Sequence, residues 1–294
     1  MKPYLQRTRQ WLLMVPPFIA TSILTNIPTD AATLAFSQSD IKFTNFSESV
    51  GRIELVNNAD ISGVANGGIF GGQNSASNNS TTSPPEVDSS AFSLAFGDSR
   101  DYKGTAHSQA QIVGNFDVDA GELFSFDFAV KLNLQTAIDN PLIEKAGARG
   151  NIYFLLFDTT NISPDSIKEL EDSFSSIDTG KLKYNPLEYF KLNGNLNTFG
   201  LQDFINYQQS TNVKVSQQHL KSNFGGISEI ASASVKGSLQ HQFKSKANVT
   251  LLALRRNQTT VSIPEPALGI ALIFFVLIIL FTLFSRRRSH RRNY

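Results

Sequence analysis

The segment ELFSFDFAVKLNLQ, residues 122–135, constrains the fold of this chain more than any other stretch. Apolar side chains occupy every second position, and polar or small side chains lie between them. Because successive side chains of a β-strand point to opposite faces, this period indicates a strand with one buried and one solvated face. The six apolar positions are Phe124, Phe126, Phe128, Val130, Leu132 and Leu134.

A second alternating segment, GTAHSQAQIVGNFDV (104–118), precedes the first one. The short stretch Asp119-Ala120-Gly121 separates them and predicts an antiparallel hairpin. A similar pair lies near the end, where a strand over 231–240 is followed by a return strand, KANVTLLALRR. Shorter strands are predicted at IKFTNF, GRIELV, AFSLAF and NIYFLLF.

Strands with one polar and one apolar face are typical of antiparallel sheets, which stack to bury their apolar faces. The predicted fold is therefore mainly β. We expect an antiparallel β-sandwich or jelly-roll-like domain over 36–263, with one or two short helices. The stretch 66–90 is rich in Gly, Asn, Ser and Thr, and it is predicted to be a flexible loop.

Helix signals are confined to the region 159–225, which we interpret as a partly helical excursion from the sandwich. Ser163-Pro164 is a good N-cap and first helical position, and it predicts a helix near 164–175. Asn185-Pro186 predicts a second short helix through Leu192, and 201–207 a further helical turn.

Composition narrows the classes of function. Residues 36–263 hold 18 Lys plus Arg against 23 Asp plus Glu, a net charge of −5, so nucleic acid is not a predicted partner. The chain has no cysteine, which excludes disulfides and a thiol nucleophile.

The first 35 residues have the layout of an export signal. Lys2, Arg7 and Arg9 form a basic start, a mostly apolar stretch follows over 11–27, and small residues come next. This order predicts a signal peptide cleaved after Ala35. Cleavage a few residues earlier and an uncleaved N-terminal anchor are the alternatives.

The last 31 residues have three parts. Pro264-Glu265-Pro266 comes first, and the uncharged span 267–284 follows, long enough as a helix, about 27 Å, to cross a bilayer. The basic residues after the span predict a cytoplasmic tail by the positive-inside rule. They are Arg286, Arg287, Arg288, Arg291 and Arg292.

This tail resembles the PEP-CTERM sorting tag of bacteria, with Pro264, Glu265 and Pro266 as the motif. The resemblance covers only the tail. It implies recognition and removal of the tag by an exosortase, a membrane-embedded transpeptidase-like enzyme. It also implies a precursor in the inner membrane and a product at the cell envelope, at the surface or outside the cell. An unprocessed single-pass anchor is the alternative.

Several stretches are possible chemical sites. The acidic residues of 117–122 could hold calcium or form a solvated turn. The chain has no H-E-x-x-H or G-x-S-x-G motif, and no two of its acids stand out as a glycosidase pair. His107 and His241 are expected to face solvent or to be hydrogen-bonded. We therefore predict no enzymatic activity, no cofactor and no metal site.

The function predicted from the sequence is that of an exported structural or adhesive protein of the surface or extracellular matrix. The alternative is a lectin-like module for extracellular polysaccharide. Sugars stack on aromatic rings that carry a polar tip, and Tyr184, Tyr189 and Tyr207 are the candidates for such a cluster. Core or rim packing of these tyrosines is the competing interpretation.

Overall fold

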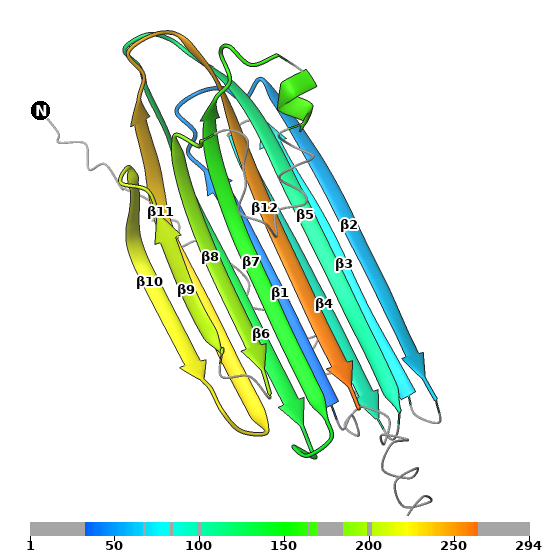
Figure 1. Ribbon diagram of the computed structural model, residues 1–294. Coiled ribbons are helices and arrows are strands. Elements are labelled where there is room, and N and C mark those ends of the chain that lie inside the picture. The colour runs from blue at the N-terminus through cyan, green and yellow to red at the C-terminus, as the bar shows by residue number, and fades with distance from the viewer. Residues whose placement is uncertain are drawn as a thin grey trace, which may run out of the picture. The chain divides into compact units, whose positions relative to one another are not determined.

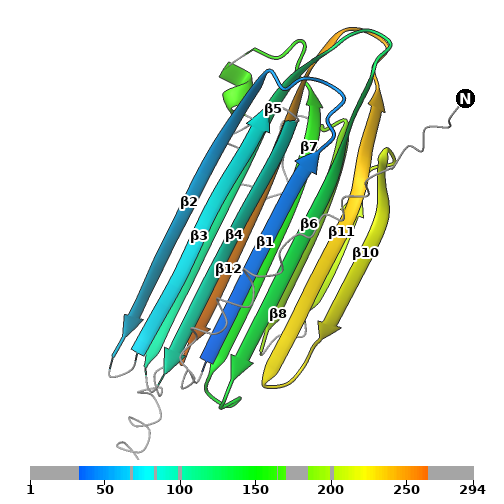
Figure 2. The ribbon, with the colours of Figure 1, turned by 180° about the vertical axis from the view of Figure 1, so that it is seen from behind.

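A computed structural model describes residues 33–66, 69–82, 85–98, 101–163, 165–169, 185–198 and 202–263. These residues form two six-stranded sheets in which all neighbouring strands are antiparallel. The two sheets lie face to face. We call the sheet nearer the viewer in Figure 1 sheet B, and the sheet nearer the viewer in Figure 2 sheet A. The prediction of a mainly antiparallel β fold is thus confirmed.

In spatial order, sheet A contains β10 (Val213–Asn223), β11 (Ser228–Gln242), β6 (Leu123–Ile138), β1 (Thr33–Thr44), β4 (Pro85–Asp98) and β3 (Ile69–Thr82). Sheet B contains, in the same sense, β9 (Phe204–Gln209), β8 (Glu188–Asn197), β7 (Lys145–Asp158), β12 (Ala247–Ser262), β5 (Tyr102–Val118) and β2 (Arg52–Ala65). The described strands number twelve, against the eight of a jelly roll.

The predicted strands form, but the predicted hairpin between 104–118 and 122–135 is wrong. β5 pairs with β2 and β12 in sheet B, whereas β6 pairs with β1 and β11 in sheet A. The turn at Gly121, whose φ is +86°, therefore carries the chain from one sheet to the other. β11 and the return strand β12 are divided between the sheets in the same way.

This arrangement places two apolar faces opposite each other rather than side by side. The rings of Phe116 on β5 and Phe124 on β6 meet edge to face, with centroids 4.9 Å apart. Alternation reports which face of a strand is buried, but it does not report which strand lies beside it.

Three further predictions from local sequence are wrong. Most of the expected loop 66–90 is strand, because β3 and the first half of β4 pair along their length and satisfy their backbone groups. Residues 188–192 of the expected helix are instead the start of β8, and residues 204–207 of the expected turn are the start of β9. Tertiary pairing outweighed the local helix signals.

One expected helix is present in part. Residues 165–169 are helical, with the Ile167 N–H donating to the Ser163 carbonyl. Residues 170–184, the remainder of the predicted helix and the segment after it, lie outside the described residues.

Apolar side chains fill the larger part of the space between the sheets. Phe154 of β7 lies at the centre of an aromatic cluster and contacts rings from both sheets. Its partners are Phe43 and Phe126 at 5.7 and 5.6 Å, and Phe128 and Phe190 at 5.0 and 5.4 Å. Edge-to-face and offset geometries of this kind are the favourable ones for aromatic rings.

A buried polar layer interrupts the apolar core. Asn257 of β12 donates from Nδ2 to Ser39 Oγ at 2.8 Å and to the Ala91 carbonyl at 3.0 Å, and it accepts from Ser37 Oγ at 2.8 Å. Arg255 is also buried, and its guanidinium donates to Ser89 Oγ and to Asn78 Oδ1. Burial lowers the pKa of Arg255 to about 9. Because this value is still above neutral pH, the guanidinium stays charged there.

The outer face of sheet B is divided into two zones. Toward the end of the sheet where β12 begins lies a buried apolar cluster, which includes Leu155, Leu252 and Leu254. The other zone is polar, and it is the part of the described surface that carries the candidate site.

Candidate functional site: a polar groove on sheet B

Two adjoining hollows cross the polar zone of sheet B. Their volumes are about 350 and 380 Å³, and both are lined by Arg149 and Asn151 of β7, so we treat them as one groove. The first hollow extends over β12, β5 and β2, and the second over β8 and β9. Six strands of one sheet therefore contribute to a single surface feature.

The side chains of the groove lie in two rows that run across the strands. In each row, every residue is the cross-strand partner of the next one in the ladder. Row one consists of Asn58, Gln109, Arg256, Asn151, Asn193 and Asn206. Row two consists of Asp60, His107, Gln258, Arg149, Asn195 and Phe204. Side chains that are directly opposite in a sheet lie within contact range, so each row forms a continuous line.

Hydrogen bonds to neutral amides orient the two arginines of the groove. Arg256 Nε donates to Gln109 Oε1 at 3.2 Å, and Arg149 Nε donates to Asn195 Oδ1 at 3.4 Å. Both of these acceptors are neutral amides, and Arg256 has a further interaction besides the one with Gln109. The two arginines are on adjacent strands and diagonal to each other, because Arg256 is opposite Asn151 and Arg149 is opposite Gln258.

One buried acceptor in row one lacks a donor. Asn193 Oδ1 is inaccessible to solvent and has no hydrogen-bond partner among the described residues. Buried polar atoms are nearly always paired, so this oxygen is an exception within the described part of the sheet.

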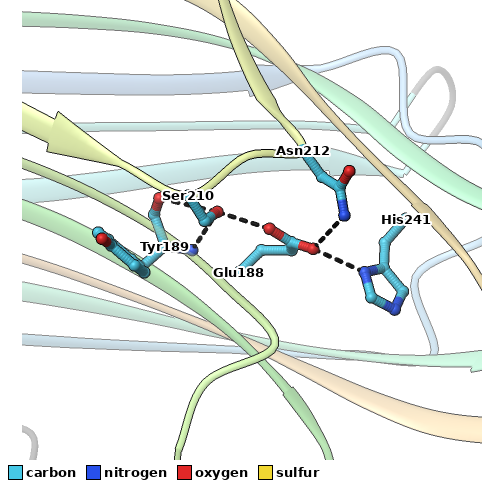
Figure 3. Close-up of polar contacts among 5 residues, drawn as sticks. All are labelled: Glu188, Tyr189, Ser210, Asn212 and His241. Atoms are coloured by element: carbon cyan, nitrogen blue, oxygen red, sulfur yellow. Dashed lines mark hydrogen bonds and ion pairs between the residues drawn. The ribbon is translucent and has the colours of Figure 1, made fainter.

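A second polar cluster lies between the two sheets, away from the groove (Figure 3). The carboxylate of Glu188, 4% exposed, accepts from Ser210 Oγ at 2.5 Å and from Asn212 Nδ2 at 2.6 Å. His241 Nδ1 lies 2.8 Å from Glu188 Oε1. Burial by itself raises the pKa of Glu188, but these three hydrogen bonds outweigh it, so the pKa lies below its usual value.

The connectivity of this cluster is that of a structural clamp. In a nucleophilic triad the histidine bridges the hydroxyl and the acid, whereas here the carboxylate of Glu188 bridges Ser210 and His241. The hydroxyl of Ser210 therefore donates to the carboxylate and not to the imidazole. Glu188 comes from sheet B and His241 from sheet A, so the cluster ties the two sheets together.

Two acids do form a pair, at the end of the sandwich. Glu229 on β11, 1% exposed, shares a hydrogen bond with Asp203 and accepts from the Gly225 N–H at 2.9 Å. Glycosidase carboxylates stand about 5 Å or more apart, which is too far for a direct hydrogen bond. Burial raises the pKa of Glu229, and the charge of Asp203 raises it further.

The raised pKa of Glu229 predicts a stabilising substitution. The folded protein holds this proton more tightly than the unfolded chain, so stability is lost as the pH rises through the raised pKa. We expect Glu229→Gln to increase the free energy of unfolding at pH 7 by on the order of 1 kcal/mol, and to have little effect near pH 4. Urea unfolding at both pH values measures this. Equal stability of Glu229→Gln and the wild type at pH 7 would contradict it, and exposed Glu122→Gln is the control.

The structure places one of the predicted processing residues. Ala35 is fully buried inside β1, paired with Ala95 and Thr136. Pro264, Glu265, Pro266, the span 267–284 and the arginines of the tail lie outside the described residues. Within the described residues, no helix has the length and the apolar character needed to cross a bilayer.

The predicted tyrosine cluster is not brought together. Tyr207 faces the core, where its ring stacks on Phe190 at 5.9 Å, whereas Tyr189 packs beside the apolar cluster on the outer face of sheet B. Tyr184 lies outside the described residues. The packing interpretation holds for both placed tyrosines.

The structure also places the 117–122 stretch, His107 and His241. Asp119 of the 117–122 stretch is 71% exposed and pairs with Lys246 at 3.3 Å. Across the described part of the chain, no three His, Cys, Asp or Glu side chains are grouped to hold a metal ion. His241 is hydrogen-bonded to Glu188, and His107 lines the groove.

Sequence reasoning missed the rows of the groove. The only signal was an excess of amides at outward positions of separate strands, and their alignment depends on strand register. The comparisons with known proteins add no assignment, because no protein-family model matches the chain and no curated protein matches it either.

Proposed function

We propose that this chain is an exported protein of the cell surface or extracellular matrix, held by the span 267–284 and processed at Pro264-Glu265-Pro266 by an exosortase-type enzyme. The three-part tail is the observation that carries this proposal. The position of the tail supports it, because β12 ends at Ser262 and the Ile263 N–H donates to the Tyr102 carbonyl at 3.0 Å. The last strand thus ends directly before the proposed recognition motif.

The first strand bears on the other processing site. Thr33 is fully buried, its hydroxyl accepts a hydrogen bond from Tyr102, and Thr33, Leu34 and Ala35 all pair within sheet A. Removal of residues 1–35 would take three residues from β1 and leave buried partners unpaired. We therefore place signal cleavage before Thr33, a few residues earlier than the position after Ala35.

The intact mass of the mature protein tests both ends. In cells that contain the processing enzyme, we expect a chain that begins no later than Thr33 and lacks the span 267–284. In cells without the enzyme, the same N-terminus should appear with the tail retained. Retention of the tail in both would remove the sorting proposal, and a mature N-terminus at Phe36 would contradict the placement of the cleavage. Glu265→Gln tests the motif by the same measurement. If the enzyme recognises Glu265, this variant should retain the tail in cells that contain the enzyme.

A second candidate function is polysaccharide binding. The amide rows of the groove favour it, because Asn and Gln offer a donor and an acceptor together, as sugar hydroxyls do. The two proposals are compatible, because one exported protein can both belong to the matrix and bind a glycan.

A further inference from the structure

The direction of the rows defines the shape of a matching ligand. Neighbouring strands are about 4.8 Å apart, so a row across six strands extends about 24 Å. This spacing is close to the advance of one pyranose ring along an extended glycan. A linear polysaccharide lying across the strands would therefore present a new sugar to each strand of sheet B.

The hydrogen-bonding groups of row one fit hydroxyl-rich rings. Asn151, Asn193 and Asn206 are on consecutive strands, and each amide offers both a donor and an acceptor. Asn193 lies between the other two, and it lines the hollow over β8 and β9. Phe204, 40% exposed, closes row two with an apolar face on which a ring can stack.

The charges of the groove select among polysaccharides. Arg149 and Arg256 lie diagonally on β7 and β12, a separation at which one carboxylate can interact with both guanidiniums. The single acid of the two rows, Asp60, is on the edge strand β2, three strands away from Arg149. Within the two rows, the charged side chains near the centre of the groove are thus the two arginines, although residues 36–263 carry a net charge of −5.

We propose that the groove binds a linear polysaccharide containing uronic acid residues, which lies across the strands with a sugar carboxylate between Arg149 and Arg256. This inference rests on the second candidate function, because it names the ligand class of the same groove. A polyphosphate such as nucleic acid fits less well. It carries a negative charge on every nucleotide, and residues 36–263, whose net charge is also negative, repel it.

Native affinity electrophoresis of the full-length protein in detergent tests the inference. The gels contain polygalacturonate, alginate or hyaluronate, and the matched neutral polymer is fully methyl-esterified polygalacturonate. We expect retardation by at least one uronate polymer. Arg149→Gln and Arg256→Gln should each weaken that binding by about tenfold or more, because a charge-assisted contact is lost. Binding of the esterified polymer, where present, should change little.

Asn193→Ala serves as the second arm, and it should weaken binding of acidic and esterified polymers alike. Arg52→Gln is the matched control, since Arg52 is on β2 outside the groove and pairs with Glu54. Far-UV circular dichroism of each variant verifies the fold.

The outcomes separate the inference from the functions on which it rests. Two results would overturn the recognition of carboxylates but not glycan binding itself. One is equal affinity for the acidic and esterified polymers, and the other is unchanged binding in both arginine variants. Equal competition by polyglutamate or single-stranded DNA would show a general anion surface and overturn it too. Absence of binding to all four polysaccharides would remove the inference and the second candidate function together, whereas the mass measurement of the tail would be unaffected.

Discussion

Phe154→Ala is expected to lower the free energy of unfolding by about 3–5 kcal/mol. The Phe154 ring is fully buried on β7 and contacts four other aromatic rings, two on β6, one on β1 and one on β8. Truncation removes the buried area of the ring, leaves a cavity between the two sheets, and abolishes four ring contacts that contribute beyond area alone.

Urea unfolding of the full-length protein, followed by far-UV circular dichroism, measures this loss. Residues 36–263 contain no tryptophan, so fluorescence of that residue does not report on the sandwich. The matched control is Phe224→Ala, because Phe224 is 40% exposed in the turn between β10 and β11. A loss of less than about 1 kcal/mol for Phe154→Ala would contradict the packing of the aromatic cluster around this ring.

Asn257→Ala is the second substitution with a large expected effect, a loss of about 2–4 kcal/mol. The amide of Asn257 bonds to three buried serine hydroxyls and one backbone carbonyl. Its removal leaves several of these groups buried without a partner, and each unpaired group costs about 1–3 kcal/mol unless the hydroxyls pair again among themselves.

The same unfolding experiment applies, and Asn223→Ala at the exposed end of β10 is the control. The control should stay within about 0.5 kcal/mol of the wild type. If Asn257→Ala unfolds like the control, the buried polar layer does not contribute to stability as the hydrogen bonds indicate. Asn257→Leu separates the effect of the cavity from the effect of the lost hydrogen bonds, since leucine fills the space but makes no hydrogen bond.

The strands were the most predictable part of the fold. In β6, six apolar residues at period two identified the buried face, and those six side chains are buried in the core. The stretch Ile69–Thr82 shows the limit of such reasoning. Its Asn, Ser and Thr content suggested a loop, yet it forms β3, because pairing with β4 satisfies its backbone without a strong apolar pattern.

The candidate site was much less predictable than the strands. Asn58, Gln109 and Arg256 are polar residues at outward positions of three strands, and in the sequence they are indistinguishable from ordinary solvated side chains. Only the pairing of β2, β5 and β12 places them in one line. A shift of one residue in any ladder would turn that strand's side chains to the other face and break the row.

The sequence by itself determined the local periodicity, the polar and apolar face of each strong strand, and the three-part tail on which the proposal of processing rests. These are short-range properties, set by side-chain spacing and by the length of an uncharged segment. The tertiary structure alone decided which strands pair, which turns cross between the sheets, and which distant polar residues meet. Strand partners depend on the free energy of packing the two complete sheets together, a quantity to which every residue of the sandwich contributes.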